Sequence, residues 1–269
     1  MSTHRLVTLY SGSSGNSVFV SSGSTNILID AGKSAKALCA ALREIGSDIG
    51  EIDAIFITHE HCDHVSALET LCKKQSIPVH IANESAKKFD RTPDSSVHSR
   101  MVRHDPVFSE AVGNMTVTSF RTPHDSSMSV GYRIEFCNES GKHVFGVATD
   151  IGYVTPSIRE GLTGCEAVVL ESNHDPQMLD EGPYPYNLKL RIRSKKGHLS
   201  NGECACFAAS LAQSGTKGFI LAHLSAENNM PELAYDEIYS AISDASVKIC
   251  VAAPDSPTEL ALDMEEVSI

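Results

Sequence analysis

Three histidines and an aspartate are packed into residues 59–64, where the chain reads His-Glu-His-Cys-Asp-His directly after a short apolar stretch. Side chains alternate along an extended backbone, so we expect His59 and His61 to point the same way. A turn beyond them can bring Asp63 and His64 round to a second ion. A surface cluster without metal is the alternative, but ligand spacing after a buried strand favours an ion. The sequence therefore predicts a metal site that can begin two metal-binding centres.

Length and composition favour one folded domain. With 269 residues the chain can bury a large core, and it has no low-complexity tract, Gly/Ser linker or solenoid repeat. We expect a single domain over residues 1–269. No stretch is long and apolar enough to cross a membrane, and the amino terminus lacks the pattern of a signal peptide. We therefore expect a cytoplasmic protein with no membrane partner.

The eight cysteines are scattered without CxxC pairs, so we expect no disulfide framework. Cys204 and Cys206 could form a zinc or redox pair. Residues two apart on a helix do not share a face, however, and this favours core packing. Cys62 alternates with His61 and Asp63 along the chain and should point away from the ions.

The formal net charge of −12 argues against a protein that coats nucleic acid, because such binding is driven by Lys and Arg neutralising phosphates. It does not exclude a phosphate substrate, since bound divalent ions would reverse the local sign of the field. A basic run at 189–196 carries five positive charges. We expect Lys189, Arg191 and Arg193 to contact substrate, with a solvated face as the ordinary alternative. The pattern fits a helix or a strand equally.

Short apolar segments alternate with helical patterns along the whole chain. In the first half we expect strands at 6–9, 17–20, 26–29, 54–58 and 79–81, helices at 34–45, 65–74 and 84–89, and β-rich sequence from 115 to 148. In the second half we expect strands at 167–170, 218–221 and 247–251 and helices at 200–213 and 231–242. Two β-rich halves with helices between strands indicate a layered α/β sandwich. The tail after Pro254 has few apolar anchors, and we expect it to fray.

Further metal ligands must come from other parts of the chain, because two ions need more ligands than the first motif supplies. His124, Asp150 and His223 each follow an apolar segment that reads as a strand. The ends of strands are where a sandwich fold gathers its functional loops. Taken singly, each of the three could be a structural loop or turn residue. Together with the first motif they complete a candidate dinuclear site.

His198 is the candidate for giving a proton to the leaving oxygen. Ser200 or Asn201 can cap the helix that follows, so the imidazole would lie near the positive end of that helix. A histidine that merely packs beside the cap is the alternative. Asp63 can both bind metal and orient the attacking water.

Glu171, Asn173 and His174 follow another buried segment and offer a further polar group. Asn173 and His174 are candidates for binding substrate. Glu171 could bind substrate or support His198, and a carboxylate in this position can equally fix the tautomer of a metal ligand.

Several motifs accompany these residues, namely Ser11–Ser17, Leu28–Gly32, Ala148–Tyr153, Glu171–Asp175, Gly197–Asn201 and Ala222–Ser225. With the run at 59–64 they resemble the metallo-β-lactamase superfamily of dinuclear hydrolases. Within it they look like the YycJ (WalJ, VicX) group of proposed bacterial exonucleases, which is related to the β-CASP nucleases and RNase Z. The resemblance covers residues 9 to 231. It implies a four-layer αββα sandwich, α/β in class, with the site at one rim.

The resemblance also implies a role for each ligand. His59, His61 and His124 would hold the first ion and Asp63, His64 and His223 the second, with Asp150 bridging them. RNase Z and phosphodiesterases of this fold carry a non-ligand histidine in the segment that matches His198. β-CASP nucleases have an inserted domain for which this chain has too few residues. Substrate capture would then rely on the rim of the sandwich, and we leave open whether a partner or a second subunit of a homo-oligomer contributes.

We therefore expect a dinuclear metal phosphodiesterase acting on nucleic acid, with DNA favoured over RNA, and specifically a 5′-to-3′ DNA exonuclease. Its two divalent ions would be Zn, Mn or Fe, because His and carboxylate without thiolate suit all three. The main rival is a hydrolase of a small carbonyl substrate such as a thioester, lactone or β-lactam, since the same ions polarise a carbonyl equally well. A binding module whose ions have a supporting role is the non-enzymatic alternative.

Overall fold

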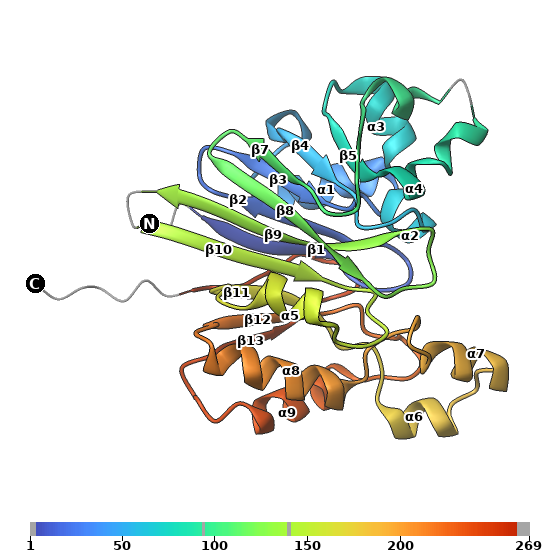
Figure 1. Ribbon diagram of the computed structural model, residues 1–269, viewed down its shortest axis with the longest axis vertical. Coiled ribbons are helices and arrows are strands. Elements are labelled where there is room, and N and C mark those ends of the chain that lie inside the picture. The colour runs from blue at the N-terminus through green and yellow to red at the C-terminus, as the bar shows by residue number, and fades with distance from the viewer. Residues whose placement is uncertain (1–3, 93–94, 139–140, 263–269) are drawn as a thin grey trace, which may run out of the picture.

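Four layers make up the fold, which the computed structural model describes for residues 4–92, 95–138 and 141–262. Two sheets lie face to face, and helices cover the outer face of each sheet (Figure 1). One cluster of buried apolar side chains lies between the sheets, and two others lie between a sheet and its helices. The expected αββα sandwich is therefore confirmed.

The first sheet has seven strands in the order β14-β1-β2-β3-β4-β5-β6. Their bounds are β1 (Arg5–Tyr10), β2 (Ser17–Ser21), β3 (Asn26–Ile29), β4 (Ala54–Phe56), β5 (Val79–Ala82), β6 (Met101–His104) and β14 (Thr258–Glu259). Strands β1 to β3 are antiparallel neighbours, whereas β3 to β6 run parallel. The carboxyl ends of β3, β4 and β5 therefore meet at one edge of the sheet.

The second sheet repeats this arrangement in the order β13-β12-β11-β10-β9-β8-β7. Its strands are β7 (Ser109–Val112), β8 (Met115–Thr122), β9 (Ser129–Asn138), β10 (Gly141–Ala148), β11 (Ala167–Glu171), β12 (Gly218–Ala222) and β13 (Lys248–Val251). Strands β7 to β10 are antiparallel, and β10 to β13 run parallel. The carboxyl ends of β10, β11 and β12 thus also meet at one edge.

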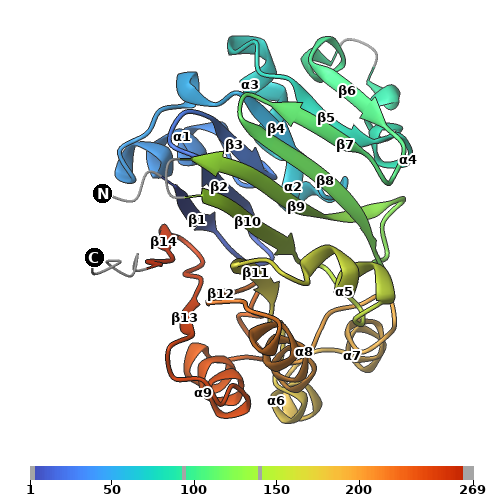
Figure 2. The ribbon, with the colours of Figure 1, turned by 60° about the vertical axis from the view of Figure 1, so that its left-hand side comes forward.

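Helices of the first half pack on the first sheet and helices of the second half on the second (Figure 2). The α-helices are α1 (Ala35–Glu44), α2 (Cys62–Val65), α3 (Leu68–Lys74), α4 (Asn83–Ala86), α5 (Pro156–Leu162), α6 (Pro176–Glu181), α7 (Tyr186–Ile192), α8 (Asn201–Gln213) and α9 (Pro231–Ala241). Short 3-10 turns are η1 (Ile49–Glu51), η2 (Phe89–Arg91) and η3 (Ser96–Ser99). Within the described ranges no helix has both the length and the apolar composition needed to span a bilayer.

Contacts between the two sheets hold the loop that begins the histidine motif. Tyr132 of β9 is fully buried, and its hydroxyl donates to the carbonyl of Ile57 at 2.6 Å. The backbone N–H of Val130 donates to the carbonyl of Thr58 at 3.1 Å. Because buried backbone groups need such partners, the second sheet fixes where the motif leaves β4.

Some expected elements differ from the structure. Strands β6 and β7 and helix α5 were not predicted, and the basic run at 189–196 begins within helix α7. The tail after Pro254 was expected to fray, but β14 pairs with β1 and Leu260 is buried. Residues 263–269, the last part of that tail, lie outside the described residues. All eight cysteines are free, and Cys62 is exposed. Core packing was expected for Cys204 and Cys206; Cys204 is buried, but Cys206 is exposed because residues two apart on a helix do not share a face.

Candidate metal centre

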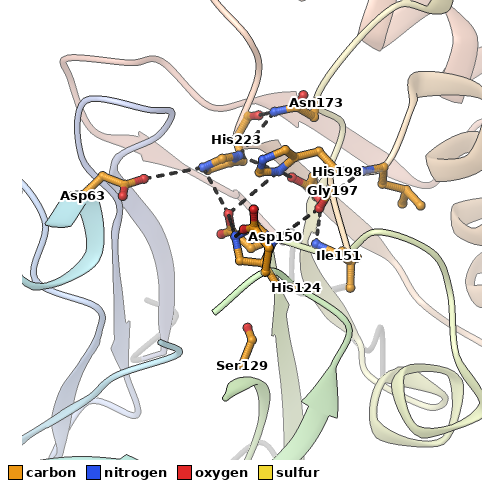
Figure 3. Close-up of polar contacts among 12 residues, drawn as sticks. Asp63, His124, Ser129, Asp150, Ile151, Asn173, Gly197, His198 and His223 are labelled. Atoms are coloured by element: carbon orange, nitrogen blue, oxygen red, sulfur yellow. Dashed lines mark hydrogen bonds and ion pairs between the residues drawn. The ribbon is translucent and has the colours of Figure 1, made fainter. Parts of the chain in front are cut away.

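The predicted ligands meet at the rim where the parallel strands of both sheets end. Residues 59–64 follow β4, His124 follows β8, Asp150 follows β10 and His223 follows β12. Figure 3 shows Asp63, His124, Asp150 and His223 converging from separate segments. The fold thus brings together side chains that lie up to 164 residues apart, from His59 to His223.

Several overlapping groups of candidate ligands lie at this rim, and two groups of three share no residue. In each group, one ligand atom per residue lies within 4.8 Å of the others. One group consists of His59, His61 and His124, and the other of Asp63, His64 and His223. These are the same two sets that the family resemblance implies.

The carboxylate of Asp150 lies between the two groups. Its Oδ1 is 3.6 Å from Nε2 of His124 and 3.5 Å from Nε2 of His223, and its Oδ2 is 3.4 Å from Nε2 of His64. Burial alone would raise the pKa of this carboxyl, but the histidines around it hold the pKa well below the usual range. Asp150 therefore stays ionised and faces both groups.

Several buried polar atoms at this rim have no hydrogen-bond partner among the described residues. They include Nε2 of His59, Nε2 of His223 and Oδ2 of Asp150. An unsatisfied buried polar atom costs about 1–3 kcal/mol, so a fold does not normally gather several at one point. Imidazole and carboxylate are ligands for divalent zinc, manganese and iron. These residues therefore fit bound divalent ions.

Polar partners behind the ligands orient their rings. Asp30 accepts from Nδ1 of His64 at 2.8 Å and from Thr58 through both its backbone N–H and its hydroxyl at 2.8 Å. Nε2 of His64 is thereby turned toward the rim. Asn173 donates to the carbonyl of His223 at 2.7 Å, and its amide nitrogen lies 3.3 Å from Nδ1 of the same residue. Neither Asp30 nor this role of Asn173 was predicted.

Strained backbone occurs where these side chains leave their strands. Asp30, Asp150 and His223 have φ values of 65°, 57° and 58°, in the left-handed region that L-residues seldom occupy. Such conformations cost about 1–3 kcal/mol each and persist only where the surroundings enforce them. Asp30 and His223 directly follow β3 and β12, and Asp150 lies two residues beyond the end of β10, so each left-handed residue occurs where the chain reaches the rim.

His198 lies beside the two groups, and its orientation is set by Glu171. Nδ1 of His198 is 2.7 Å from Oε1 of Glu171, which is fully buried. Oε2 of Glu171 accepts from the backbone N–H groups of Ile151 and Leu199 at 2.7 and 3.2 Å. Burial would raise the pKa of this carboxyl, but the contacts with His198 and His223 lower it instead. An ionised Glu171 therefore fixes the proton on Nδ1 of His198.

A pocket of about 170 Å³ adjoins His198 and His223. Its lining includes Tyr184, Arg191 and Asn173. Ser200 is the N-cap of α8, closed by a capping box with Glu203. Because Nδ1 of His198 is held by Glu171, its other ring nitrogen remains for a molecule in this pocket.

The basic run largely serves contacts within the protein. The Lys189 ammonium donates to the carbonyls of Asp180 and Gly182 at 2.7 Å each, and Arg193 pairs with Asp180 at 2.5 Å. These bonds fasten α7 to α6. Arg191 pairs with Asp125 at 2.5 Å and lines the pocket beside His198.

His174, the remaining candidate for substrate binding, is buried and pairs through its backbone with Ser200. It does not line the pocket beside His198. Of the residues expected to contact substrate, the structure thus places Arg191 and Asn173 at the pocket and Lys189, Arg193 and His174 away from it. Asn16, for which we predicted no role, lies close to the second group, with its amide nitrogen 3.2 Å from Oδ2 of Asp63.

The four-layer αββα fold, with two groups of candidate metal ligands on either side of the Asp150 carboxylate, is the arrangement of a metallohydrolase. Residues 25–224 match the family model described as Beta-lactamase superfamily domain, and the chain belongs to this superfamily. It is 37% identical to the exodeoxyribonuclease YycJ of Bacillus anthracis, over 84% of each chain. It is 32% identical to the exodeoxyribonuclease WalJ of Streptococcus pneumoniae, over 94% of this chain and 95% of that one.

A solved structure supports the fold independently. The metallo-β-lactamase fold protein YhfI of Bacillus subtilis matches with a TM-score of 0.69 at 17% identity, covering 96% of this chain and all of that one. Taken together, the fold, the family and the His and Asp clusters identify a metal-dependent hydrolase.

Removal of bound metal should lower the thermal stability of the protein. A ligand present at a hundred times its Kd stabilises a fold by about 2.7 kcal/mol, and 1 kcal/mol corresponds to about 2–4 °C in Tm for a domain of this size. We expect a chelator to lower Tm by about 5 °C or more and added zinc or manganese to restore it. Differential scanning fluorimetry measures the shift, with Asp150→Ala as the variant that should not respond. A wild-type Tm unchanged after complete metal removal would contradict the site.

Proposed function

We propose that the protein is a dinuclear metal phosphodiesterase that removes nucleotides from DNA as a 5′-to-3′ exonuclease. The observation that carries the proposal is the pair formed by His198 and Glu171 beside the ligand groups. A leaving oxygen in phosphodiester hydrolysis needs a proton, and a histidine held in one tautomer can give it. The names of the relatives YycJ and WalJ support DNA as the substrate. We also propose that it acts in the cytoplasm.

The seven ligands divide between two ions in this proposal. His59, His61 and His124 would hold one ion, Asp63, His64 and His223 the other, and Asp150 both. When bound, zinc, manganese or iron at such a centre acidifies a water molecule and neutralises charge on the phosphoryl oxygens. The donor set does not select among the three metals.

Asp63 is suited to orient the attacking water. Its side chain is 17% exposed, so it is accessible from the rim. Burial would raise the pKa of Asp63, but contacts with His223 and His64 lower it far below the usual range. Asp63 is therefore a carboxylate at neutral pH and can accept a hydrogen bond from the nucleophile.

His198 would donate a proton to the leaving 3′ oxygen of the released nucleotide. Glu171 keeps the proton on Nδ1, so protonated His198 presents its second N–H toward the pocket. After the bond breaks, the neutral imidazole remains held by Glu171 and is ready to be protonated again. Arg191 and Tyr184, which line the pocket, would contact the phosphate and base of the same nucleotide.

A hydrolase of thioesters, lactones or β-lactams is the competing function. Comparison of bis(p-nitrophenyl) phosphate with a thioester and with nitrocefin separates the two. We expect turnover of the diester and none of the carbonyl substrates, because Arg191 on the pocket wall would bind an anionic phosphate and the carbonyl group of the other substrates carries no such charge. Thioester hydrolysis without diester hydrolysis would overturn the proposal.

Direction of attack is tested with labelled duplexes. We expect DNA labelled at the 5′ end to release the label as a mononucleotide before an internal label appears. Covalently closed circular DNA should resist cleavage. Rapid cutting of the circle would show an endonuclease instead.

A further inference from the structure

A second cavity adjoins the metal centre at His61, on a different ligand from the pocket beside His198. Its volume is about 580 Å³, more than three times that of the pocket. Its lining includes Lys87, Lys88 and Arg91, at the end of α4 and in η2. In Figure 1 α4 and α7 stand on either side of α2 along the rim. We call the second cavity the α4 cleft.

The cations of the α4 cleft differ from those of the basic run in having few partners within the protein. Lys87 and Arg91 are exposed, and neither side chain forms a hydrogen bond or ion pair within the described part of the chain. Lys189 and Arg193, by contrast, are bonded to α6 and its neighbouring loop. In a chain of net charge −12, unpaired cations beside a hydrolytic centre point to an anionic ligand.

The α4 cleft is tied directly to the histidine motif. Glu60 stands between two ligands, and its carboxylate accepts from the Ser85 hydroxyl and the Ser127 backbone N–H, both at 2.7 Å. The Lys88 ammonium donates to the carbonyl of Glu60. These bonds fix α4 against the motif and bind the Glu60 carboxylate internally. A polyanion lying in the cleft would therefore lie beside His61, one of the candidate metal ligands.

One acid opposes such a ligand. Glu84 also lines the α4 cleft, and its Oε2 is buried without a hydrogen-bond partner among the described residues. Three cations face two acids here, and the carboxylate of one acid, Glu60, is already bonded. Glu84 would repel an anion in the cleft. Removing its charge should therefore strengthen the binding of an anion, whereas removing a cation should weaken it.

We propose that the α4 cleft binds the phosphate backbone of the DNA that remains after each cut, while the pocket beside His198 takes the terminal nucleotide. This inference rests on the proposed phosphodiesterase function. Contacts of Lys and Arg with phosphates carry no sequence preference and are weakened by salt. The larger α4 cleft would thus hold the remaining DNA strand, and the smaller pocket beside His198 would hold the nucleotide that is released.

The test uses the double variant Lys87→Ala/Arg91→Ala. We expect the ratio of kcat/KM on a 30-nucleotide DNA to kcat/KM on bis(p-nitrophenyl) phosphate to fall about tenfold or more, with the loss in KM for DNA. Affinity for DNA falls as salt rises. The steepness of the plot of log affinity against log salt concentration should be smaller by about 1.4–1.8 when two phosphate contacts are lost. Glu84→Gln should raise the ratio of kcat/KM on DNA to kcat/KM on bis(p-nitrophenyl) phosphate.

Lys142→Ala/Lys217→Ala is the control for net charge, because it removes two positive charges from exposed lysines away from the rim. Lys142 lies in β10, where it pairs with Glu135 at 2.9 Å, and Lys217 lies just before β12. An unchanged ratio in the Lys87→Ala/Arg91→Ala variant, or an equal fall in the control, would overturn the inference. A wild-type protein that binds labelled DNA through these residues in an anisotropy assay yet cleaves no diester would overturn the proposed function and leave the α4 cleft standing.

Discussion

Asp150→Asn should abolish bound metal at one or both positions and reduce kcat/KM on a phosphodiester by about 10³-fold or more. The Asp150 carboxylate faces His64, His124 and His223, and an amide offers one neutral oxygen where the carboxylate offers two charged ones. Metal ions supply several kcal/mol of transition-state stabilisation, and about 1.4 kcal/mol is a factor of ten in rate. Metal analysis by mass spectrometry and steady-state kinetics on the same preparation measure both effects.

Asp236→Asn is the matched control for this change. The substitution is chemically identical, but Asp236 is exposed on α9 and has no role at the rim. We expect it to retain metal and activity. If Asp150→Asn kept two ions and full activity, Asp150 would not be shared between the two ligand groups.

His198→Ala should lower kcat by about 10²–10⁴-fold while bound metal stays unchanged. The side chain lies beside the ligand groups and is held by Glu171. Because the proton matters most for a poor leaving group, the loss should be greater on DNA than on bis(p-nitrophenyl) phosphate, whose nitrophenolate leaves readily. Rates on both substrates and metal content are the measurements.

Glu171→Gln tests how Glu171 acts on His198. Glutamine keeps the shape but removes the charge that fixes the His198 proton, so we expect a smaller loss with the same dependence on leaving group. A loss in His198→Ala that is equal for both substrates would show that His198 does not protonate the leaving oxygen. Loss of bound metal in His198→Ala would show that His198 is a metal ligand.

Features of the fold and site that depend on residues close together in the sequence could be predicted from it. The run at 59–64 is readable because ligand spacing is local, and apolar segments before His124, Asp150 and His223 mark strand ends. The strand ends meet at one rim because parallel strands share a direction. Sheet order follows from long-range pairing and could not be read in this way.

Residues that orient the candidate metal ligands were not predicted, because their hydrogen-bond partners are distant in sequence. Asp30 lies 34 residues from His64, and nothing in its own neighbourhood indicates that bond. The internal contacts of the basic run at 189–196 could not be predicted for a similar reason, since Lys189 donates to backbone carbonyls of another segment. Charge content alone does not distinguish an internal tether from a substrate contact.

Helix α5 was missed although its start is marked in the sequence. Thr155 caps it and Pro156 occupies its first turn, a recognised signature of a helix start. Strands β6 and β7 have no such mark, because they lie at sheet edges and are half-exposed, so apolar alternation is weak. The tail was misjudged because the anchor of Leu260 on the first sheet depends on β14 pairing with β1.

Anomalous scattering from crystals of the purified protein, combined with metal analysis in solution, tests the dinuclear centre most directly. We expect two divalent ions per chain, one among His59, His61 and His124 and one among Asp63, His64 and His223, with Asp150 contacting both. Crystals of an active preparation that show no transition metal at this rim would contradict the dinuclear centre.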